Sequence, residues 1–282
     1  MEESRLTMTE PFSPALLLQQ VLDTFEATPD PRLREIMQAA VRHLHAFARE
    51  VGLETDERRA GVQFLTAVGQ ISDEVRQECE MLSDTLGLSS LVETSSTPDG
   101  ATLRTLTGPF YAPGSPPREY GASMVERDDG DPPAVISGRI TGAGGAPIAG
   151  ATLDVWQNAS NRLYAIQDPE QPRFNLRGIY RSGADGRYEL RTIKPVSYTI
   201  PDDGPVGKML ESTGRHPWRA AHVHFLVQAD GFLPLTTEIF DADSDYLDSD
   251  AVFGVAPELI LDFSRGEDGV HRTTFDIMLR AA

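Results

Sequence analysis

The sequence predicts a mainly β protein with an α-helical N-terminal part, in which a β-sandwich domain follows a helical domain. Three observations lead to this fold class. Apolar residues recur at helical spacing through the first hundred residues, a Pro-, Gly- and Asp-rich connection runs from 111 to 133, and short alternating runs with turn signals fill the remainder. We place the boundary after residue 105, which gives a helical domain of 1–105 and a β-sandwich domain of 106–282.

Helix-starting signals divide the first domain. Ser13-Pro14 and Asp30-Pro31 each combine a capping side chain with a proline that suits the first helical turn. An apolar stripe from Ile36 to Val51 follows the second signal, and Gly52 is typical of the position just past a helix end. Cys79 lies on the apolar stripe of a later helical segment, so we expect a buried, unreactive thiol there.

Short strands are predicted throughout the second domain. The runs with strand character are 136–140, 151–155, 222–227, 236–240, 259–261 and 275–279. Asp185-Gly186 separates two further strand-like runs and predicts a hairpin turn between them. Short strands at this regular spacing favour a β-sandwich.

The charge balance excludes several classes of partner. The chain has 282 residues, with 25 Lys and Arg against 43 Asp and Glu, so its formal net charge is −18. Nucleic acid and anionic membrane surfaces repel such a protein, so we expect neither as a partner. We find no signal-peptide pattern and no apolar run near ~18 residues, so we expect a cytoplasmic protein.

A pair of histidines is the sharpest local candidate for chemistry. His222 and His224 are two residues apart on a predicted strand, where alternate side chains share a face, so both rings can reach one metal ion. Two exposed strand histidines would show the same spacing, and this alternative stays open. Tyr164 and Tyr198 fall at predicted strand ends, where an ordinary half-buried tyrosine is the simpler interpretation of each.

Longer motifs resemble one known family over nearly the whole chain. They occupy residues 64–73, 82–89, 108–111, 150–157, 175–178, 185–188 and 219–225. With these motifs the chain resembles the intradiol ring-cleaving dioxygenases, which open an aromatic ring between two adjacent hydroxylated carbons. Accidental agreement over motifs of this length and order is improbable.

The resemblance implies a mononuclear non-haem Fe(III) site, with one ferric ion per subunit. Its ligands would be Tyr164, Tyr198, His222 and His224. The chemistry of these side chains agrees with the assignment. Phenolates are hard anionic donors that a trivalent ion holds deprotonated, whereas ferrous oxygenases use two histidines and one carboxylate.

The substrate implied by the resemblance is a small aromatic diol, which O2 cleaves. Residues 203–207, 214–217, 246–247 and 249–255 look more like the branch of the family that cleaves hydroxyquinol (benzene-1,2,4-triol) than the branch that cleaves catechol. Hydroxyquinol would give maleylacetate. The alternative is catechol, which would give cis,cis-muconate, or another substituted catechol.

Further residues take expected roles from the same resemblance. Arg219 would be a fixed cation that stabilises negative charge on the ring, with an ordinary salt bridge as its alternative. Tyr198 would leave the metal and accept a substrate proton. The positions that match the family's ring pocket are Leu106, Gly108, Pro109, Phe110, Ile200, Pro201, Arg219 and Val252.

Three positions depart from the family pattern. Glu238, a candidate catalytic residue, stands where we expect glutamine or histidine. Its carboxylate could accept a hydrogen bond from a third ring hydroxyl or lower the potential of the iron. Ala220 replaces a proline beside Arg219, which alters the stiffness of that loop. Arg162 replaces a glycine in the turn before Tyr164, which leaves the geometry of that turn open.

The resemblance also implies a homodimer formed through the N-terminal helices, with a phospholipid at the interface. Any helical bundle would carry the same apolar stripe, so the residues alone do not decide the matter. They also leave two other functions open, a zinc hydrolase that uses His222 and His224 and a β-sandwich binding module without a metal. Metal content separates the three functions.

Overall fold

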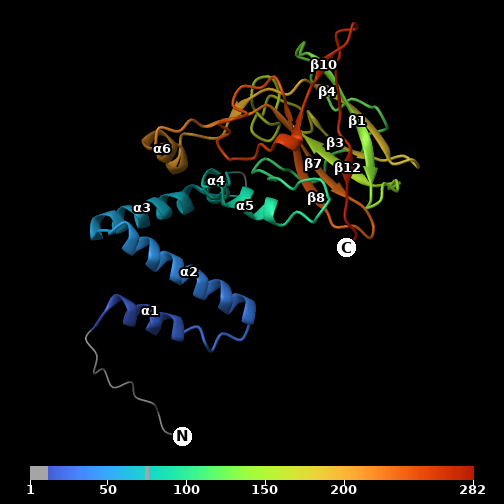
Figure 1. Ribbon diagram of the computed structural model, residues 1–282. Coiled ribbons are helices and arrows are strands. Elements are labelled where there is room, and N and C mark those ends of the chain that lie inside the picture. Colours follow the sequence, from blue (N-terminus) through green and yellow to red (C-terminus); the bar gives the residue numbers. More distant parts are fainter. Residues whose placement is uncertain (1–11, 74–75) are drawn as a thin grey trace. The chain divides into compact units, whose positions relative to one another are not determined.

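Figure 1 shows the computed structural model of the chain, in which residues 12–73 and 76–282 are described. Helices α1 to α5 precede the first strand and strands dominate the rest of the described chain, so the predicted fold class is confirmed. The chain divides into two compact units, the first ending at Leu65 and the second beginning at Thr66. The boundary expected after residue 105 stays a prediction. No helix in the described part of the chain is long and apolar enough to cross a membrane.

The first unit contains α1 (Pro14–Asp23), α2 (Pro31–Glu50) and most of α3 (Thr55–Ile71). The side chains of Ser13 and Asp30 accept hydrogen bonds from first-turn N–H groups, at 3.2 Å and 2.8 Å, so both predicted caps are present. Gly52 follows α2 with a φ of 62°. Neither α1 nor α2 buries a side chain, so the apolar stripe of α2 is largely uncovered within the described chain.

The second unit begins with the end of α3 and continues with α4 (Glu78–Thr85) and α5 (Leu88–Ser95). The prediction for Cys79 is wrong, because its side chain is exposed and its Sγ lies 3.2 Å from the Ser72 hydroxyl. The buried face of α4 carries Glu78, Met81 and Asp84. Position 79 lies about 100° around the helix from position 78, and so falls off that face.

Two five-stranded sheets and a two-stranded ladder form the β part of this unit. One sheet has the order β10-β11-β1-β12, with β4 also paired to β1, and the other has the order β3-β2-β7-β8-β9. The bounds in the first sheet are β1 (Pro133–Thr141), β4 (Arg187–Ile193), β10 (Ser264–Arg265), β11 (His271–Thr274) and β12 (Ile277–Met278). Those in the second are β2 (Thr152–Trp156), β3 (Arg177–Arg181), β7 (His222–Gln228), β8 (Leu235–Asp241) and β9 (Ile260–Leu261). The ladder pairs β5 (Tyr198–Thr199) with β6 (Trp218–Arg219), and the remaining elements are α6 (Pro205–Ser212) and the 3-10 helix η1 (Pro257–Leu259).

An apolar core lies between the two larger sheets. Ile136 of β1 and Val223 and Phe225 of β7 are fully buried in it. The Phe225 ring lies 6.5 Å from that of Tyr188 on β4, which joins the two sheets. Burial of one such side chain contributes roughly 1.5–3 kcal/mol. Because one face of β7 is fixed in this core, its other face is a rigid support for functional side chains.

Asp185 and Gly186 form a turn, but the predicted hairpin is wrong. They connect β3 to β4, and these strands belong to different sheets. The local turn chemistry is as expected, since Gly186 has a φ of 79°. An Asp-Gly turn reverses the chain in either case, whether the strands on its two sides pair with each other or join different sheets. Only the packing of the sheets decides between these outcomes.

Candidate metal centre

His222 and His224 lie side by side on β7, as the strand spacing predicts. They are 0% and 2% exposed, so the alternative of two exposed strand histidines is wrong. Their Nε2 atoms are 3.1 Å apart. Nδ1 of His222 donates a hydrogen bond to the carbonyl oxygen of Ala220 at 2.6 Å, which leaves the lone pair on Nε2. That lone pair is available to a metal ion.

Tyr164 and Tyr198 bring two phenol groups to the histidines. Tyr164 lies in the loop between β2 and β3, and its hydroxyl is 3.4 Å from Nε2 of His222. Tyr198 begins β5, and its ring centre is 5.3 Å from that of Tyr164 and 5.5 Å from that of His222. Both tyrosines are buried. The four residues expected as ligands therefore converge from a strand, a loop and a short ladder.

Two aromatic rings and a glycine pack against Tyr164 and His224. Phe110 stacks on Tyr164 with ring centres 4.9 Å apart. Trp156 stacks on His224 at 4.8 Å with the planes only 4° apart. Gly108 has a φ of 70°, and a Cβ atom there would lie 3.5 Å from the His224 ring. The rings are thus held in position from several sides, which limits their freedom to turn away.

A buried cluster of three charged groups adjoins the histidines. Arg219 donates to Glu238 at 2.9 Å and, through two nitrogens, to Asp250 at 3.1 and 3.3 Å. Its Nη1 also lies 3.1 Å from Nε2 of His222. Glu238 faces His224 across the β7–β8 ladder, and its Oε1 is 3.5 Å from one nitrogen of each histidine. With both carboxylates ionised the cluster has one excess negative charge, which a metal cation would offset.

Burial sets the protonation of the candidate ligands. Burial, and then the nearby Arg219 guanidinium, hold the pKa of His222 and of His224 well below the usual range, so both rings are neutral. Burial raises the pKa of Tyr164 and of Tyr198, so both phenols stay protonated until a cation binds. Burial also raises the pKa of Glu238, to about 6.

The donor set fits a ferric ion. Two neutral imidazoles and two phenols that lose their protons to a trivalent cation provide a mixed nitrogen and oxygen set with two anionic donors. Within the described residues, His222, His224 and Glu238 also place candidate ligand atoms within 4.8 Å of one another, which are the donor types of a ferrous site. The oxygen of Glu238 that lies 3.5 Å from both histidines, Oε1, already accepts a hydrogen bond from Arg219, so the tyrosine and histidine set is the better fit.

A pocket beside Phe110 is the candidate route to the metal centre. It has a volume of about 260 Å³, and Pro109, Phe110 and Pro201 of the predicted ring pocket line it. Met81 of α4 lies on its wall as well. The four candidate ligands do not line this pocket, and Phe110, which stacks on Tyr164, connects its wall to the centre. Leu106, Ile200 and Val252, the other apolar residues expected in the ring pocket, are all buried.

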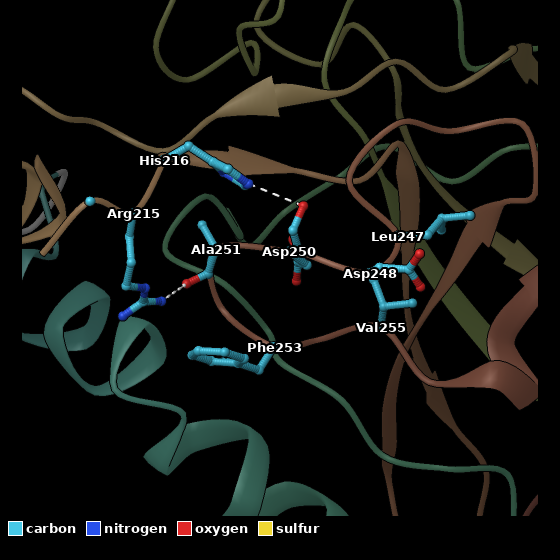
Figure 2. Close-up of a pocket in the computed structure, with 10 residues that line it drawn as sticks. Arg215, His216, Leu247, Asp248, Asp250, Ala251, Phe253 and Val255 are labelled. Atoms are coloured by element: carbon cyan, nitrogen blue, oxygen red, sulfur yellow. Dashed lines mark hydrogen bonds between the residues drawn. The ribbon is translucent and has the colours of Figure 1, made fainter.

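A larger pocket of about 440 Å³ contains none of the expected site residues. Asp250, Ala251 and Phe253 form part of its wall, as Figure 2 shows. Arg215 donates a hydrogen bond to the carbonyl oxygen of Ala251 at 2.9 Å, and His216 lies at its rim. It adjoins the metal centre through Asp250, which holds Arg219.

Two residues of the centre were not found from the sequence. Asp250 lies in a matched motif, but no local signal pairs it with Arg219, which is 31 residues away. Trp156 follows the predicted strand 151–155 and ends the observed β2, and only its register opposite His224 places it against that ring. The departure at Arg162 is explained, since its φ of 70° is the conformation that a glycine adopts freely. Ala220 keeps the role of its carbonyl toward His222 without a proline ring.

Comparisons with known proteins show the family to which the chain belongs. Residues 106–281 match the family model described as "Dioxygenase", and residues 30–102 match the one described as "Catechol dioxygenase N terminus". The chain is 45% identical over 265 residues to a 6-chlorohydroxyquinol 1,2-dioxygenase of Cupriavidus pinatubonensis, covering 93% of this chain and 96% of that protein. It is 46% identical over 242 residues to a hydroxyquinol 1,2-dioxygenase of Rhizobium sp., covering 85% and 82%.

Solved structures show the same pattern. The crystal structure of hydroxyquinol 1,2-dioxygenase from Pseudomonas putida DLL-E4 superposes with a TM-score of 0.88 at 45% identity, covering 95% of this chain and 99% of that one. That of catechol 1,2-dioxygenase from Pseudomonas arvilla C-1 superposes with a TM-score of 0.79 at 29% identity, covering 95% and 91%. The hydroxyquinol enzyme is therefore the more similar of these two in sequence and in structure.

Proposed function

This chain belongs to the family of intradiol ring-cleaving dioxygenases, and from that premise we propose that it cleaves hydroxyquinol with O2 to give maleylacetate. The observation that carries the proposal is the convergence of Tyr164, Tyr198, His222 and His224 in one buried centre. The higher identity to hydroxyquinol enzymes than to the catechol enzyme of P. arvilla supports hydroxyquinol as the substrate.

We assign one ferric ion per subunit to these four side chains. Bound there, a ferric ion would supply a Lewis acid that activates the aromatic diol. The protein contributes the anionic donors and the geometry. The stacked rings of Phe110 and Trp156 keep Tyr164 and His224 oriented for binding.

Tyr198 is the proposed acceptor of a substrate proton. Held as a phenolate in the iron-loaded centre, Tyr198 would take the proton from one hydroxyl of the diol as the diol binds. Arg219 is the direct cross-strand partner of Tyr198, and its charge opposes the effect of burial on the pKa of that phenol. The same guanidinium lies 3.1 Å from Nε2 of His222, beside the proposed position of the ferric ion. Its charge would stabilise negative charge that develops on the substrate ring.

Glu238 is the proposed contact for the third hydroxyl of hydroxyquinol. It is fully buried, and among the described residues no hydrogen bond of ordinary geometry reaches its Oε2. A buried carboxylate oxygen without a donor is unfavourable, and a substrate hydroxyl would supply one. Catechol lacks that hydroxyl, so the contact with Glu238 would favour hydroxyquinol over catechol.

Visible absorption spectroscopy of the purified protein tests the proposal. A broad tyrosinate-to-iron charge-transfer band is expected, and it should shift when hydroxyquinol binds without O2. Admitting O2 should then consume one O2 for each diol and form maleylacetate. A colourless protein that contains iron would contradict the two-tyrosine ligand set. Faster turnover of catechol, with cis,cis-muconate as product, would instead establish the alternative substrate.

We also propose a homodimer formed through the N-terminal helices. The support is the apolar stripe of α2, where Ile36, Leu44 and Phe47 are about half exposed in a single chain. A bound phospholipid would cover part of the same surface. Light scattering measures the dimer, and native mass spectrometry detects a lipid that stays with it. A monomer with no retained lipid would contradict both assignments.

A further inference from the structure

Two non-glycine residues near the metal centre have left-handed backbones and contact the same indole ring. Arg162 has a φ of 70° and Tyr246 has a φ of 69°. The guanidinium carbon of Arg162 lies 4.8 Å from the centre of the Trp218 ring. The Tyr246 ring stacks on Trp218 at 5.2 Å with the planes 6° apart. Such backbone conformations persist where surrounding contacts hold them, and here these contacts meet at Trp218.

His216 fixes the tryptophan from a third side. Its Nδ1 accepts a hydrogen bond from the backbone N–H of Trp218 at 3.2 Å. Its Nε2 therefore carries the proton and donates to the Ser249 hydroxyl at 3.1 Å, the contact drawn in Figure 2. The His216 ring also lies 5.1 Å from that of Tyr246.

Each member of this group, which we call the Trp218 column (Arg162, Trp218, Tyr246), adjoins a different part of the metal centre. Arg162 is two residues before Tyr164, in the same loop. Trp218 directly precedes Arg219 and pairs across the ladder with Thr199, the neighbour of Tyr198. Tyr246 belongs to the segment that continues to Asp250.

The backbone strengthens the link to this third segment. The N–H of Ala251 donates to the carbonyl oxygen of Trp218 at 2.9 Å. Asp250, the residue before Ala251, holds the Arg219 guanidinium through two hydrogen bonds. The column thus connects the loop that contains Arg162, strand β6 and the loop from Tyr246 to Asp250. The strand pairing of the two large sheets does not make these connections.

We propose that the Trp218 column positions Tyr164 relative to Tyr198 and Arg219. The proposal rests on the proposed function, because the two tyrosines matter as partners for one ferric ion. β7 fixes the histidines, but Tyr164 lies in a loop and Tyr198 in a two-residue strand. Cross-linking these segments through one ring sets the spacing of the two phenol oxygens. Arg162, Trp218 and Tyr246 are positioning residues and not ligands.

The test uses the full-length Arg162→Asn protein, with and without ferric iron. Asparagine tolerates a positive φ but has no cation to place on Trp218. We expect a shifted or broadened charge-transfer band and release of iron to a chelator about fivefold faster, the factor that corresponds to the loss of one exposed cation–π contact. Arg162→Lys keeps the cation and should restore both. Trp218→Phe keeps a ring and should release iron more slowly than Trp218→Leu.

Metal-free protein gives an independent readout. The chain has two tryptophans, of which Trp156 is fully buried and Trp218 is half-buried, so quenching of fluorescence by acrylamide reports mainly on Trp218. Arg162→Asn should increase this quenching. The matched control is Arg173→Asn, which removes an Arg contact to the adjacent Phe174 ring at 5.0 Å and joins no segments of the centre.

The outcomes separate the two proposals. Faster iron release and stronger quenching in Arg162→Asn, but not in Arg173→Asn, support the column. An unchanged band and unchanged iron release in Arg162→Asn would overturn it, as would equal effects in the control. If wild-type protein binds iron but shows no charge-transfer band, the proposed function fails and the column loses its assigned role, even where quenching changes.

Discussion

Tyr198 and Arg219 are direct cross-strand partners in the β5–β6 ladder. The proposed proton acceptor, Tyr198, therefore lies directly opposite the fixed cation, Arg219, although the two are 21 positions apart in the sequence. Arg219 is held in turn by Asp250 and Glu238, so its charge cannot follow the phenol if Tyr198 moves. The fixed charge of Arg219 therefore stabilises the phenolate of Tyr198 only while the two residues lie next to each other.

Replacement of this tyrosine by phenylalanine removes the proposed proton acceptor. We expect Tyr198→Phe to retain a charge-transfer band from Tyr164 but to lose turnover by about 10²–10⁴-fold, the usual contribution of a positioned acid or base. Stopped-flow oxygen consumption measures the loss. Tyr120→Phe, at an exposed tyrosine, is the control. Turnover equal to that of wild type in Tyr198→Phe would remove the residue from the mechanism.

Arg219→Lys keeps the charge but loses the planar fork. Two nitrogens of Arg219 donate to Asp250 and the third donates to Glu238. The single ammonium group of a lysine cannot reproduce this geometry. We expect kcat to fall by about 10²–10³-fold, as when a preorganised donor is removed, with little change in iron content. Steady-state kinetics and metal analysis on the same sample check it. A normal kcat would mean that charge alone is sufficient at this position.

Gly254 is required for the packing of the charged cluster. A Cβ atom there would lie 2.7 Å from Nη2 of Arg219 and 3.2 Å from Oε2 of Glu238. We expect Gly254→Ala to destabilise the fold by about 1–3 kcal/mol and to lower activity, because these side chains must shift. Gly69→Ala, in α3 with nothing within 4 Å of the added atom, is the control and should be neutral or stabilising. Urea titrations of both variants measure the difference.

Asp84 predicts a pH dependence of stability in metal-free protein. Burial raises its pKa from 3.8 to about 6, so the folded state holds the proton more tightly than the unfolded state. Its stabilising effect is full below about 3.8 and is lost as the pH rises through about 6. Above that range ionised Asp84 costs up to about 3 kcal/mol, an order-of-magnitude value for two pKa units.

Asp84→Asn should therefore be more stable than wild type at pH 7.5, and the difference should shrink toward pH 5. Urea unfolding of metal-free protein at several pH values between these limits measures it. Asp230→Asn, at an exposed position, provides the comparison and should leave the pH profile unchanged. An advantage for Asp84→Asn that grows as the pH falls would show the opposite sign of linkage and contradict the assignment.

Periodicity was sufficient for some of these features. Alternation on a strand places His222 and His224 on one face and Val223 in the core, and capping chemistry predicts the helix starts at Ser13 and Asp30. These are local properties, because each depends on a few neighbouring residues. Tyr164 and Tyr198 show only a position at predicted strand ends, and their role as ligands is implied by the longer motifs alone.

Long-range packing accounts for the features that were missed. The pairing of Arg219 with Asp250 joins β6 to the loop that precedes η1, and these two segments meet only in the folded unit. The Asp185-Gly186 turn is locally correct, yet the strands around it separate into two sheets. Cys79 is apolar in a helical pattern, but α4 buries the face that carries Glu78. In each case the deciding partner is far away in the chain, beyond the reach of propensity and spacing.

Glu238→Gln tests whether Glu238, which departs from the family pattern, determines the choice of substrate. The amide is nearly isosteric and retains an acceptor for Arg219, but it removes the charged acceptor proposed for the third hydroxyl. We expect kcat/KM for hydroxyquinol to fall by about 10–100-fold, as for the loss of a hydrogen bond to a charged group, while the value for catechol changes much less. Parallel assays of the two diols measure the ratio. Glu258→Gln, at an exposed glutamate, controls for the loss of one surface charge. Equal losses for both diols would place Glu238 in the common chemistry through Arg219 and His222, and would leave the preference for hydroxyquinol to the apolar walls around Phe110.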